Sequence, residues 1–354
     1  MKTTKKVVFL SYLMFSMTLL KAQYASLKDL TPNFVMPEES QKAVTTQRIG
    51  ITDITIVYHS PLVKGRKIWG ELVPYKEVWR AGANENTTIS FPDDVTINGN
   101  SLPAGTYGLH MIPDQNEWTV IFSKNYKAWG SFFYKKEEDA LRVTVKPIPA
   151  SFQEWLSYDF IERQPNSAVV ALTWEKLRVP FKIEVNVDNV VIANYRSYLT
   201  SLAGFTWEGY YDPANYCLQK KINNEEALKW IDRSISIQKN FNNLRVKAGL
   251  LDIKGESKEA DETMKTALPM ATEDQLNRYG YRLLGEKKIP QAIEVFKMNV
   301  KKNPGSWNAY DSLAEALAMT GDKKQAISNY NIALSKAPED QKSRIQETIK
   351  KLGS

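Results

Sequence analysis

A 34-residue repeat near the C-terminus restricts the fold of this chain more than any other sequence feature. The residues that recur at this spacing are Ala292 and Ala326, Phe296 and Tyr330, and Pro304 and Pro338. A period of 34 residues fits a pair of α-helices, with small residues where the helices touch and an aromatic side chain filling the gap. One such pair cannot bury its apolar face alone, so neighbouring pairs must stack into a solenoid.

Other copies of the pattern extend this helical region. The last copy runs in the order Trp307, Leu313, Ala314, Gly321, Ala326, Tyr330, Ala333 and Pro338. A weaker copy contains Ala248, Gly255, Ala260, Met264 and Ala267, and a fainter one contains Ala214, Ala227, Ile231 and Ser234. This order is typical of tetratricopeptide (TPR) repeats. We predict three to four TPR-like helix pairs over residues 213–354, with a polar capping helix from Glu339 to Leu352 and a preceding linker helix over residues 189–212.

The region before the helices shows the period-two alternation of β-strands. Ile54, Ile56 and Tyr58 share one face of a strand, and Asn98-Gly99-Asn100 is the strongest hairpin signal. Further strands are predicted at residues 118–122, 142–146, 155–162, 168–174 and 181–187. Many short strands with closely spaced turns predict an antiparallel β-sandwich or barrel-like domain over residues 44–188. The chain is therefore expected to be multidomain, β then α.

The first 22 residues have the layout of a secretory signal peptide. Three lysines in the first six residues precede an apolar run, Val7–Leu20, and Ala22 offers a cleavage position. The run spans about 21 Å as a helix, short of the ~30 Å hydrocarbon core of a membrane. We therefore expect an exported protein, periplasmic or secreted, with no membrane span after cleavage and an extended segment over residues 23–43.

Removing this leader changes the charge of the chain. The formal net charge is +7, and the leader holds four lysines and no acid, which leaves +3 for the remainder. Such a small charge, without runs of Lys and Arg between aromatics, gives no footprint for nucleic acid. The single cysteine, Cys217, cannot form an intramolecular disulfide. Both domains must therefore be stabilised by their apolar cores.

The densest stretch of unusual residues is Ser60–Phe91, SPLVKGRKIWGELVPYKEVWRAGANENTTISF. This segment resembles the signature of a family known as domain of unknown function 2911 (DUF2911). The resemblance continues at residues 102–107, 118–120, 130–132 and 139–143, and residues 227–232 extend it into the helices. It implies a β fold that is often exported and joined to TPR repeats, and it implies no established activity.

Side chains in and near this segment suit a ligand site in the β domain. Guanidinium groups beside tryptophan and an amide can bind a glycan or a small anion by stacking and forked hydrogen bonds. The candidate ligand-binding residues are Arg66, Trp79, Arg80, Asn84, Glu85 and His110. A structural role is the alternative.

In that alternative the aromatic side chains belong to the core and the charged ones brace a long loop. The core aromatics would be Trp69, Tyr75 and Trp79, while Arg66 and Arg80 would pair with Glu71, Glu77 or Glu85. Composition alone does not choose between the two, because long loops in compact domains are either functional or packed by their own side chains.

The sequence offers no complete catalytic or metal-binding set. Zinc needs three or four ligands, and the only histidines are His59 and His110, which could recruit Glu85 or Asp53 without any short ligand-spacing motif. Ser60 next to His59 on a strand would point to the opposite face. No nucleophile elbow or phosphate-binding loop occurs. We predict no metal and no cofactor, and we favour a non-catalytic protein.

The helical repeats suggest a binding function instead. Stacked helix pairs form a concave face that grips an extended peptide. Candidate basic residues for such a face are Lys220, Lys221, Arg245, Lys247, Arg278 and Arg282, although charged residues on helices are often only solvated. The leading hypothesis is an exported binding or scaffold protein with a protein or peptide partner at the repeats. The alternative is a hydrolase acting on a carbohydrate or cell-envelope substrate, with Glu85 or His110 transferring the proton.

Overall fold

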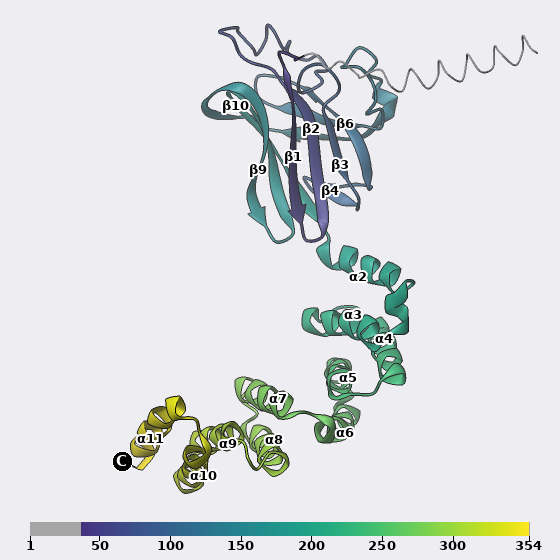
Figure 1. The fold of residues 1–354 in the computed structure, drawn as a ribbon. Helices are drawn as coiled ribbons and strands as arrows, with labels where there is room; N and C mark the ends of the chain where they lie inside the picture. The colour runs from purple at the N-terminus through teal and green to yellow at the C-terminus, as the bar shows by residue number, and fades with distance from the viewer. Residues whose placement is uncertain (1–36, 354) are drawn as a thin grey trace, which may run out of the picture. The chain divides into compact units, whose positions relative to one another are not determined.

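The computed structural model describes residues 37–353. The predicted signal peptide and most of the extended segment after it lie outside these residues. The described chain forms two compact units, a β unit that ends at Val190 and a helical unit that starts at Val191 (Figure 1). None of the helices in the described chain is long and apolar enough to cross a membrane.

The first sheet of the β unit has six antiparallel strands in the order β1-β2-β3-β6-β7-β8 (Figure 1). They are β1 (Gln41–Ile49), β2 (Thr52–Ser60), β3 (Thr88–Phe91), β6 (Gly105–Ile112), β7 (Trp118–Ser123) and β8 (Asp139–Val145). Ile54, Ile56 and Tyr58 are buried on one face of β2, as their alternation predicts. The short helix η1 (Lys136–Glu138) precedes β8.

The second sheet has four antiparallel strands in the order β5-β4-β10-β9. They are β4 (Val95–Ile97), β5 (Asn100–Leu102), β9 (Ile148–Gln164) and β10 (Ser167–Val185). The prediction of two short strands at residues 168–174 and 181–187 was wrong, because β10 runs through both. The register of β10 against β9 shifts on both sides of Glu175, whose φ is 56°. A bulge there bends the strand without ending it.

One hydrophobic core lies between the two sheets. Trp118 and Phe122 from β7 meet Trp174 and Phe181 from β10, and all four are at most 2% exposed. Two separate antiparallel sheets with a shared core make a β-sandwich, so the barrel-like alternative does not apply. The predicted turn between β4 and β5 is confirmed, since Asn98 and Gly99 have φ of 46° and 81°, as a two-residue type I′ hairpin requires.

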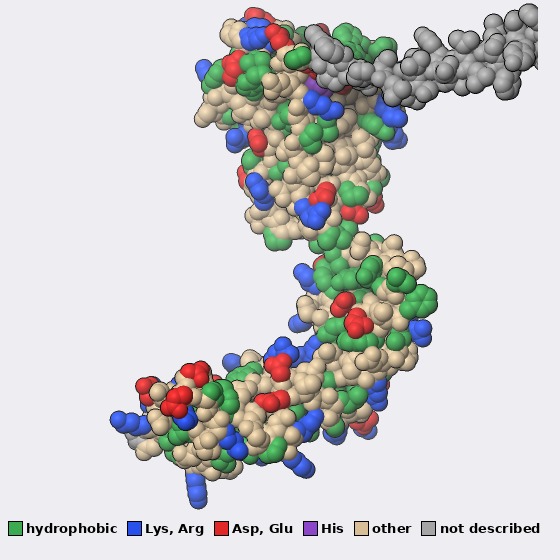
Figure 2. Space-filling model, viewed as in Figure 1, with side chains coloured by type: hydrophobic (Ala, Val, Ile, Leu, Met, Phe, Trp, Pro, Cys, Tyr) green, Lys and Arg blue, Asp and Glu red, His purple; other side chains and the backbone are tan. Residues whose placement is uncertain are grey.

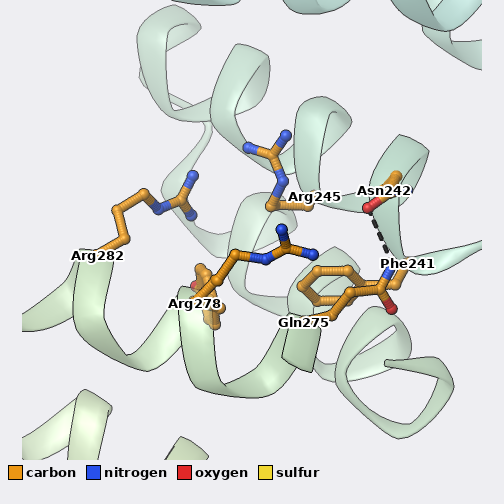
Figure 3. Close-up of a pocket in the computed structure, with 7 residues that line it drawn as sticks. Phe241, Asn242, Arg245, Gln275, Arg278 and Arg282 are labelled. Atoms are coloured by element: carbon orange, nitrogen blue, oxygen red, sulfur yellow. Dashed lines mark hydrogen bonds between the residues drawn. The ribbon is translucent and has the colours of Figure 1, made fainter. Parts of the chain in front are cut away.

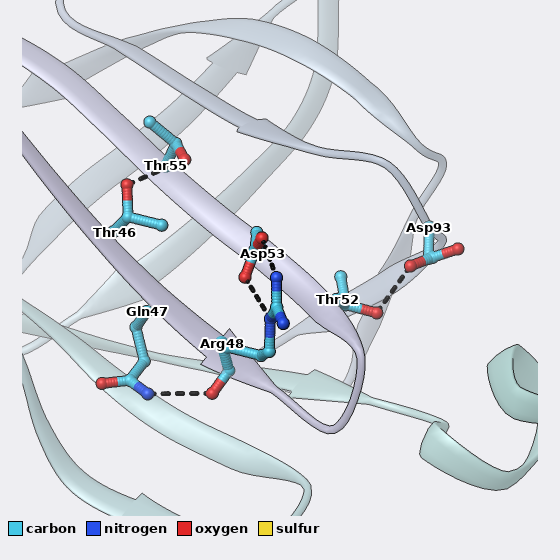
Figure 4. A network of polar contacts seen from close by, with 7 residues as sticks. All are labelled: Thr46, Gln47, Arg48, Thr52, Asp53, Thr55 and Asp93. Atoms are coloured by element: carbon cyan, nitrogen blue, oxygen red, sulfur yellow. Dashed lines mark hydrogen bonds and ion pairs between the residues drawn. The ribbon is translucent and has the colours of Figure 1, made fainter.

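Polar contacts at the β1–β2 hairpin account for Asp53 (Figure 4). The guanidinium of Arg48 donates two hydrogen bonds of 2.7 Å to the carboxylate of Asp53. These bonds lower the pKa of Asp53. Thr52 donates to Asp93 at 2.6 Å and so ties β2 to the turn after β3. Asp53 is therefore a partner of Arg48 rather than a metal ligand with His59 or His110.

Ten α-helices follow in the described chain. They are α2 (Val187–Tyr198), α3 (Trp207–Lys220), α4 (Asn224–Ile237), α5 (Phe241–Lys254), α6 (Ser257–Ala267), α7 (Glu273–Gly285), α8 (Ile289–Lys302), α9 (Trp307–Met319), α10 (Lys323–Lys336) and α11 (Glu339–Gly353), with short 3₁₀ helices η2 (Leu202–Phe205) and η3 (Leu268–Met270). The helical region starts two residues before the expected position, and α3 crosses the expected boundary between residues 212 and 213.

The helices pair as the repeat predicts (Figure 1). The pairs are α3 with α4, α5 with α6, α7 with α8, and α9 with α10, and α11 packs on α10. Both helices of the last pair begin 34 residues after their counterparts, at Trp307 after Glu273 and at Lys323 after Ile289. One core cluster contains residues from α5 through α10, so the pairs form a TPR-like solenoid.

The first helix of every pair begins at a side-chain cap. Thr206, Asn240, Thr272 and Ser306 each accept a hydrogen bond from the main-chain N–H three residues later. Each such cap stabilises its helix by about 1 kcal/mol. The helix starts are thus set locally, which explains why they follow the sequence period.

Two glycines of α7 give a matched stability prediction. A Cβ added at Gly280 would lie 2.4 Å from a ring carbon of the fully buried Phe296, whereas a Cβ at Gly285 meets nothing within 4 Å. We expect Gly280→Ala to lower the free energy of unfolding of the helical unit by about 1–3 kcal/mol through overpacking. Gly285→Ala is expected to be neutral or stabilising by up to about 1 kcal/mol. Urea denaturation of the two variants checks this, and equal effects would contradict the packing of Phe296 on Gly280.

Candidate functional site

The loop between β2 and β3, residues 61–87, is fixed to the sandwich by main-chain hydrogen bonds. Val63 N–H donates to Glu154 O at 2.9 Å, and Trp79 exchanges two bonds of 2.8 Å with Met111. Ala83 N–H donates to His59 O at 3.1 Å. The loop therefore presents its side chains from a defined backbone, which is what a binding site on a loop requires.

The aromatic residues of this loop contribute to the core. Trp69 makes edge contacts with Trp79, Trp118 and Trp174, at 4.9–5.9 Å between ring centroids. Trp79 also stacks on Trp174 at 6.1 Å. The structural reading of these tryptophans holds for their rings, although Trp79 also reaches a surface pocket.

The arginines of the loop bind main-chain carbonyl oxygens. Arg66 is exposed and donates to Val63 O at 3.0 Å and Leu62 O at 2.5 Å. Arg80 donates to Asn84 O at 3.0 Å. Within the described chain neither arginine pairs with a glutamate of the loop, so the predicted bracing by ion pairs was wrong. The carbonyl groups of this irregular backbone lack strand partners, and the arginines satisfy them instead.

Arg80 also lines a pocket of about 300 Å³. The lining residues are Pro74, Glu77, Val78, Trp79, Arg80, Ser131 and Phe132. Burial lowers the pKa of the Arg80 guanidinium. Gly130 leaves room for this group, because a Cβ there would lie 2.5 Å from Arg80 Nη1. Phe132 is 81% exposed at the rim, so the pocket offers a cation beside an open aromatic face.

His110 lies behind this pocket and is only 1% exposed. Ser131 Oγ is 3.4 Å from His110 Nδ1, and the ring of Tyr134 is 5.4 Å away. Burial lowers the pKa of His110 to about 4, although the negative charge of Asp139 acts in the opposite direction. His110 is therefore neutral at pH 7 and is reached from the pocket only through Ser131.

A second group of polar side chains gathers around His59. His59 Nε2 lies 3.2 Å from Glu85 Oε2 and 3.4 Å from Glu38 Oε2. Asn84 donates its side-chain amide to Glu38 Oε2 at 2.6 Å and to Ser40 O at 3.3 Å. Of the predicted site residues, the structure thus brings Arg80, Asn84 and Glu85 together.

The helical unit has a pocket of about 280 Å³ between α5 and α7 (Figure 3). Its lining residues are Phe241, Asn242, Arg245, Gln275, Arg278, Tyr279 and Arg282. Figure 3 shows the three guanidinium groups around one opening. Gln275 donates to Asn242 at 3.2 Å and joins the two helices beside them. The pocket is therefore rich in donors for an anion.

The three arginines differ in their partners. Arg278 pairs with Asp274, Arg282 lies 3.7 Å from Glu286 and stacks over Tyr279 at 4.8 Å, and both ion pairs are exposed. Arg245 is partly buried, and its two bonds, of 3.4–3.5 Å, go to the neutral Tyr211 and Asn215. No acidic side chain in residues 37–353 contacts Arg245. Its charge is free to meet a ligand.

The other basic candidates of the helical unit lie outside this pocket. Lys247 pairs with Asp232 at 2.8 Å, Lys220 lies over the ring of Tyr216, and Lys221 ends α3 in the left-handed conformation. On the face shown in Figure 2, basic and acidic side chains are interspersed. The arginines at α5 and α7 thus stand out by their convergence rather than by the overall charge.

Residues 40–183 match the model of a family described as protein of unknown function (DUF2911). The match begins just before β1 and ends within β10, so it covers the sandwich. The β unit is a DUF2911 domain. The resemblance carried by Ser60–Phe91 is thereby confirmed. The comparison with curated proteins found no match.

Solved structures resemble the chain over less than half its length. YrrB, described as a TPR protein with an unusual peptide-binding site, is 17% identical, with 46% of this chain and 84% of YrrB covered at a TM-score of 0.29. For MamA the values are 16%, 44%, 85% and 0.31. For the C-terminal part of a TPR repeat-containing protein from Cytophaga hutchinsonii they are 16%, 43%, 60% and 0.31. The TPR-like description of the helical unit rests on its own helix pairs.

The buried histidine predicts how the DUF2911 domain responds to acid. The pKa of His110 in the folded domain, about 4, is below its ordinary value of 6.5, so the unfolded chain takes up the proton more readily. The stability is fully present above about pH 6.5 and is lost as the pH falls to about 4, by about 3 kcal/mol. His110→Gln is expected to flatten this part of the pH profile in urea denaturation. An unchanged slope would show that other groups cause it.

Sequence reasoning missed several residues of both sites. Glu38 lies far from His59 and Glu85 in the chain, and no spacing rule links the three. Asn242 and Gln275 could have been found, because each lies three residues before an arginine, Arg245 or Arg278, and so on the same helix face.

Proposed function

We propose that this protein is a non-catalytic binding or scaffold protein whose helical unit holds an acidic segment of a protein partner. The observation that carries the proposal is the convergence of Arg245, Arg278 and Arg282 on one pocket of about 280 Å³. Arginine forks match the geometry of carboxylates and bind them through two parallel hydrogen bonds. The amides of Asn242 and Gln275 can bond a peptide backbone beside them.

The aromatic side chains of the pocket support a peptide rather than a free ion. Phe241 is 4% exposed and forms the floor between the helices, where an apolar side chain of the peptide can pack. Tyr279 holds Arg282 by a cation–π contact, which fixes the cation before binding. A pocket with an apolar floor and a cationic rim favours a segment that contains both Asp or Glu and one apolar residue.

Binding of labelled peptides tests this function. The probe is a heptapeptide with three Glu, one central Leu and Gly elsewhere, and its matched control replaces Glu with Gln. We expect saturable fluorescence anisotropy with the acidic peptide, weakened by added salt, and little binding of the Gln peptide. Equal binding of both peptides, or of neither, would overturn the proposal.

We infer that the protein acts after export. The lysines at positions 2, 5 and 6, followed by the apolar run Val7–Leu20, support a cleaved leader. The mature chain is expected to begin at Gln23. Intact-mass measurement of the protein from its own cells checks this, and a chain that retains Met1 and the apolar run would contradict it.

The Arg80 pocket supports a second ligand in the DUF2911 domain, a small anion or a glycan. Arg80 has no acidic partner in the described chain, and its single recorded bond leaves other N–H groups for a ligand. We expect Arg80→Gln to abolish any binding of inorganic phosphate or of short oligosaccharides in calorimetric titration. Arg66→Gln is the matched control, because Arg66 bonds only loop carbonyls in the described chain. Equal titrations of the two variants would count against the pocket.

The hydrolase alternative gains less support from the geometry. His110 is buried and neutral at pH 7, and Glu85 is more than half exposed, although it lies beside Glu38. Turnover of a glycan or ester that Glu85→Gln abolishes, with the fold retained, would restore this alternative.

A further inference from the structure

Three side chains from distant parts of the sequence meet beside the end of β2. Glu38 precedes β1, His59 is the second-last residue of β2, and Glu85 ends the long loop near β3. One donor atom from each lies within 4.8 Å of the other two. Imidazole nitrogen and carboxylate oxygen are both common ligands of divalent metals.

We propose that Glu38, His59 and Glu85 form a binding site for a divalent transition-metal ion, with zinc as the best fit. Donor atoms about 2.0–2.2 Å from a tetrahedral zinc lie roughly 3.3–3.5 Å apart. His59 Nε2 is 3.2 Å from Glu85 Oε2 and 3.4 Å from Glu38 Oε2, so both pairs have the spacing of two ligands on one ion.

The histidine is held in place before any ion binds. Its side chain is 8% exposed, while those of Glu38 and Glu85 are 51% and 53% exposed. Strand pairing with Lys42 and the bond from Ala83 N–H fix its backbone. A rigid imidazole with two mobile carboxylates gives the ion an entry path from solvent.

A further shell of contacts orients the carboxylates. Asn84 takes the left-handed conformation, with φ of 53°, and its amide donates to Glu38 Oε2 at 2.6 Å. Arg80 in turn donates to Asn84 O at 3.0 Å. Residues that hold metal ligands in this way commonly change metal affinity by 10- to 100-fold when they are replaced.

The donor set narrows the class of ion. Calcium takes six to eight oxygen ligands, so one nitrogen and two carboxylates do not suit it. A mixed set of nitrogen and oxygen suits zinc, and also manganese or iron(II). Three protein ligands leave a fourth tetrahedral position for water. Without an ion, the same contacts would be two ion pairs of a protonated His59.

Metal titration of the purified full chain tests the proposal. The protein is stripped with EDTA, and ZnCl₂ and MnCl₂ are then titrated against a chromogenic zinc chelator and by calorimetry. We expect one zinc ion per chain and a higher melting temperature of the β unit at saturation. Glu85→Gln and His59→Gln are expected to weaken zinc binding at least 10-fold, and Asn84→Ala about 10-fold.

Glu39→Gln is the matched control. Glu39 is next to Glu38, 82% exposed, and paired with Lys64 rather than with His59. Its variant should bind zinc as the unmodified chain does. Because Glu85 is exposed, Glu85→Gln is expected to fold even if His59→Gln does not, which circular dichroism shows. Absence of stoichiometric zinc or manganese binding, or equal binding by Glu85→Gln and Glu39→Gln, would overturn the site.

Discussion

Arg245→Ala is expected to bind the acidic heptapeptide about 10- to 100-fold more weakly than the unmodified chain. A hydrogen bond between two charged groups contributes about 1.5–3 kcal/mol, which corresponds to this change in Kd. Arg245 gives the clearest result of the three arginines, because its removal leaves no acidic side chain of residues 37–353 without a partner. Arg278→Ala and Arg282→Ala would instead release Asp274 and Glu286, which repel the peptide.

Lys247→Ala provides the control for net charge. Lys247 lies on the same helix, two residues away, and pairs with Asp232 outside the pocket. Its variant should bind the peptide within about twofold of the unmodified chain, since exposed charges act weakly through solvent at physiological salt. Fluorescence anisotropy at 0.15 M salt measures both variants. Equal weakening would mean that the peptide responds to the overall charge of the helices and not to the pocket.

Trp174→Ala is expected to lower the free energy of unfolding of the DUF2911 domain by about 3–5 kcal/mol. Trp174 is 1% exposed, contacts both Trp69 and Trp79, and donates its ring N–H to Glu154 O at 3.2 Å. Its loss leaves a large cavity and removes the surface on which the long loop packs. Backbone amides of β9 and β10 should then exchange with deuterium faster.

Trp129→Ala is the matched control in the same domain. Trp129 is 51% exposed, so its removal should change the stability by at most about 0.5 kcal/mol. Urea denaturation together with hydrogen exchange of β9 and β10 peptides separates the two variants. A small effect of Trp174→Ala would show that the loop does not depend on the stacked tryptophans.

The repeats were predictable because their signals are local. The 34-residue period, the small residues between helices and the capping residues all lie within one turn or one helix pair, where helical spacing decides which side chains meet. In the sandwich, strands such as β2 and β7 followed from alternation, whereas the bulge at Glu175 depends on how β10 bends over β9. The sequence around Glu175 therefore suggested an end that tertiary packing removes.

The sites were predictable only in part. Arg245 and Lys247 are two residues apart on α5 and point in different directions, and the sequence did not show which direction faces α7. Convergence at His59 depends on the path of residues 61–87, which is set by long-range hydrogen bonds with β6 and β9. Ligands that come from residues 38, 59 and 85 produce no motif, so the metal prediction from spacing alone was negative.

Asn84 stands between the two candidate sites of the DUF2911 domain. Its side chain binds Glu38 on the His59 side, and its carbonyl oxygen holds Arg80 on the side of the aromatic pocket. Anything that immobilises one face of this residue also reduces the freedom of the other face. Occupancy of one site and affinity at the other are then thermodynamically coupled, and the coupling must be equal in both directions.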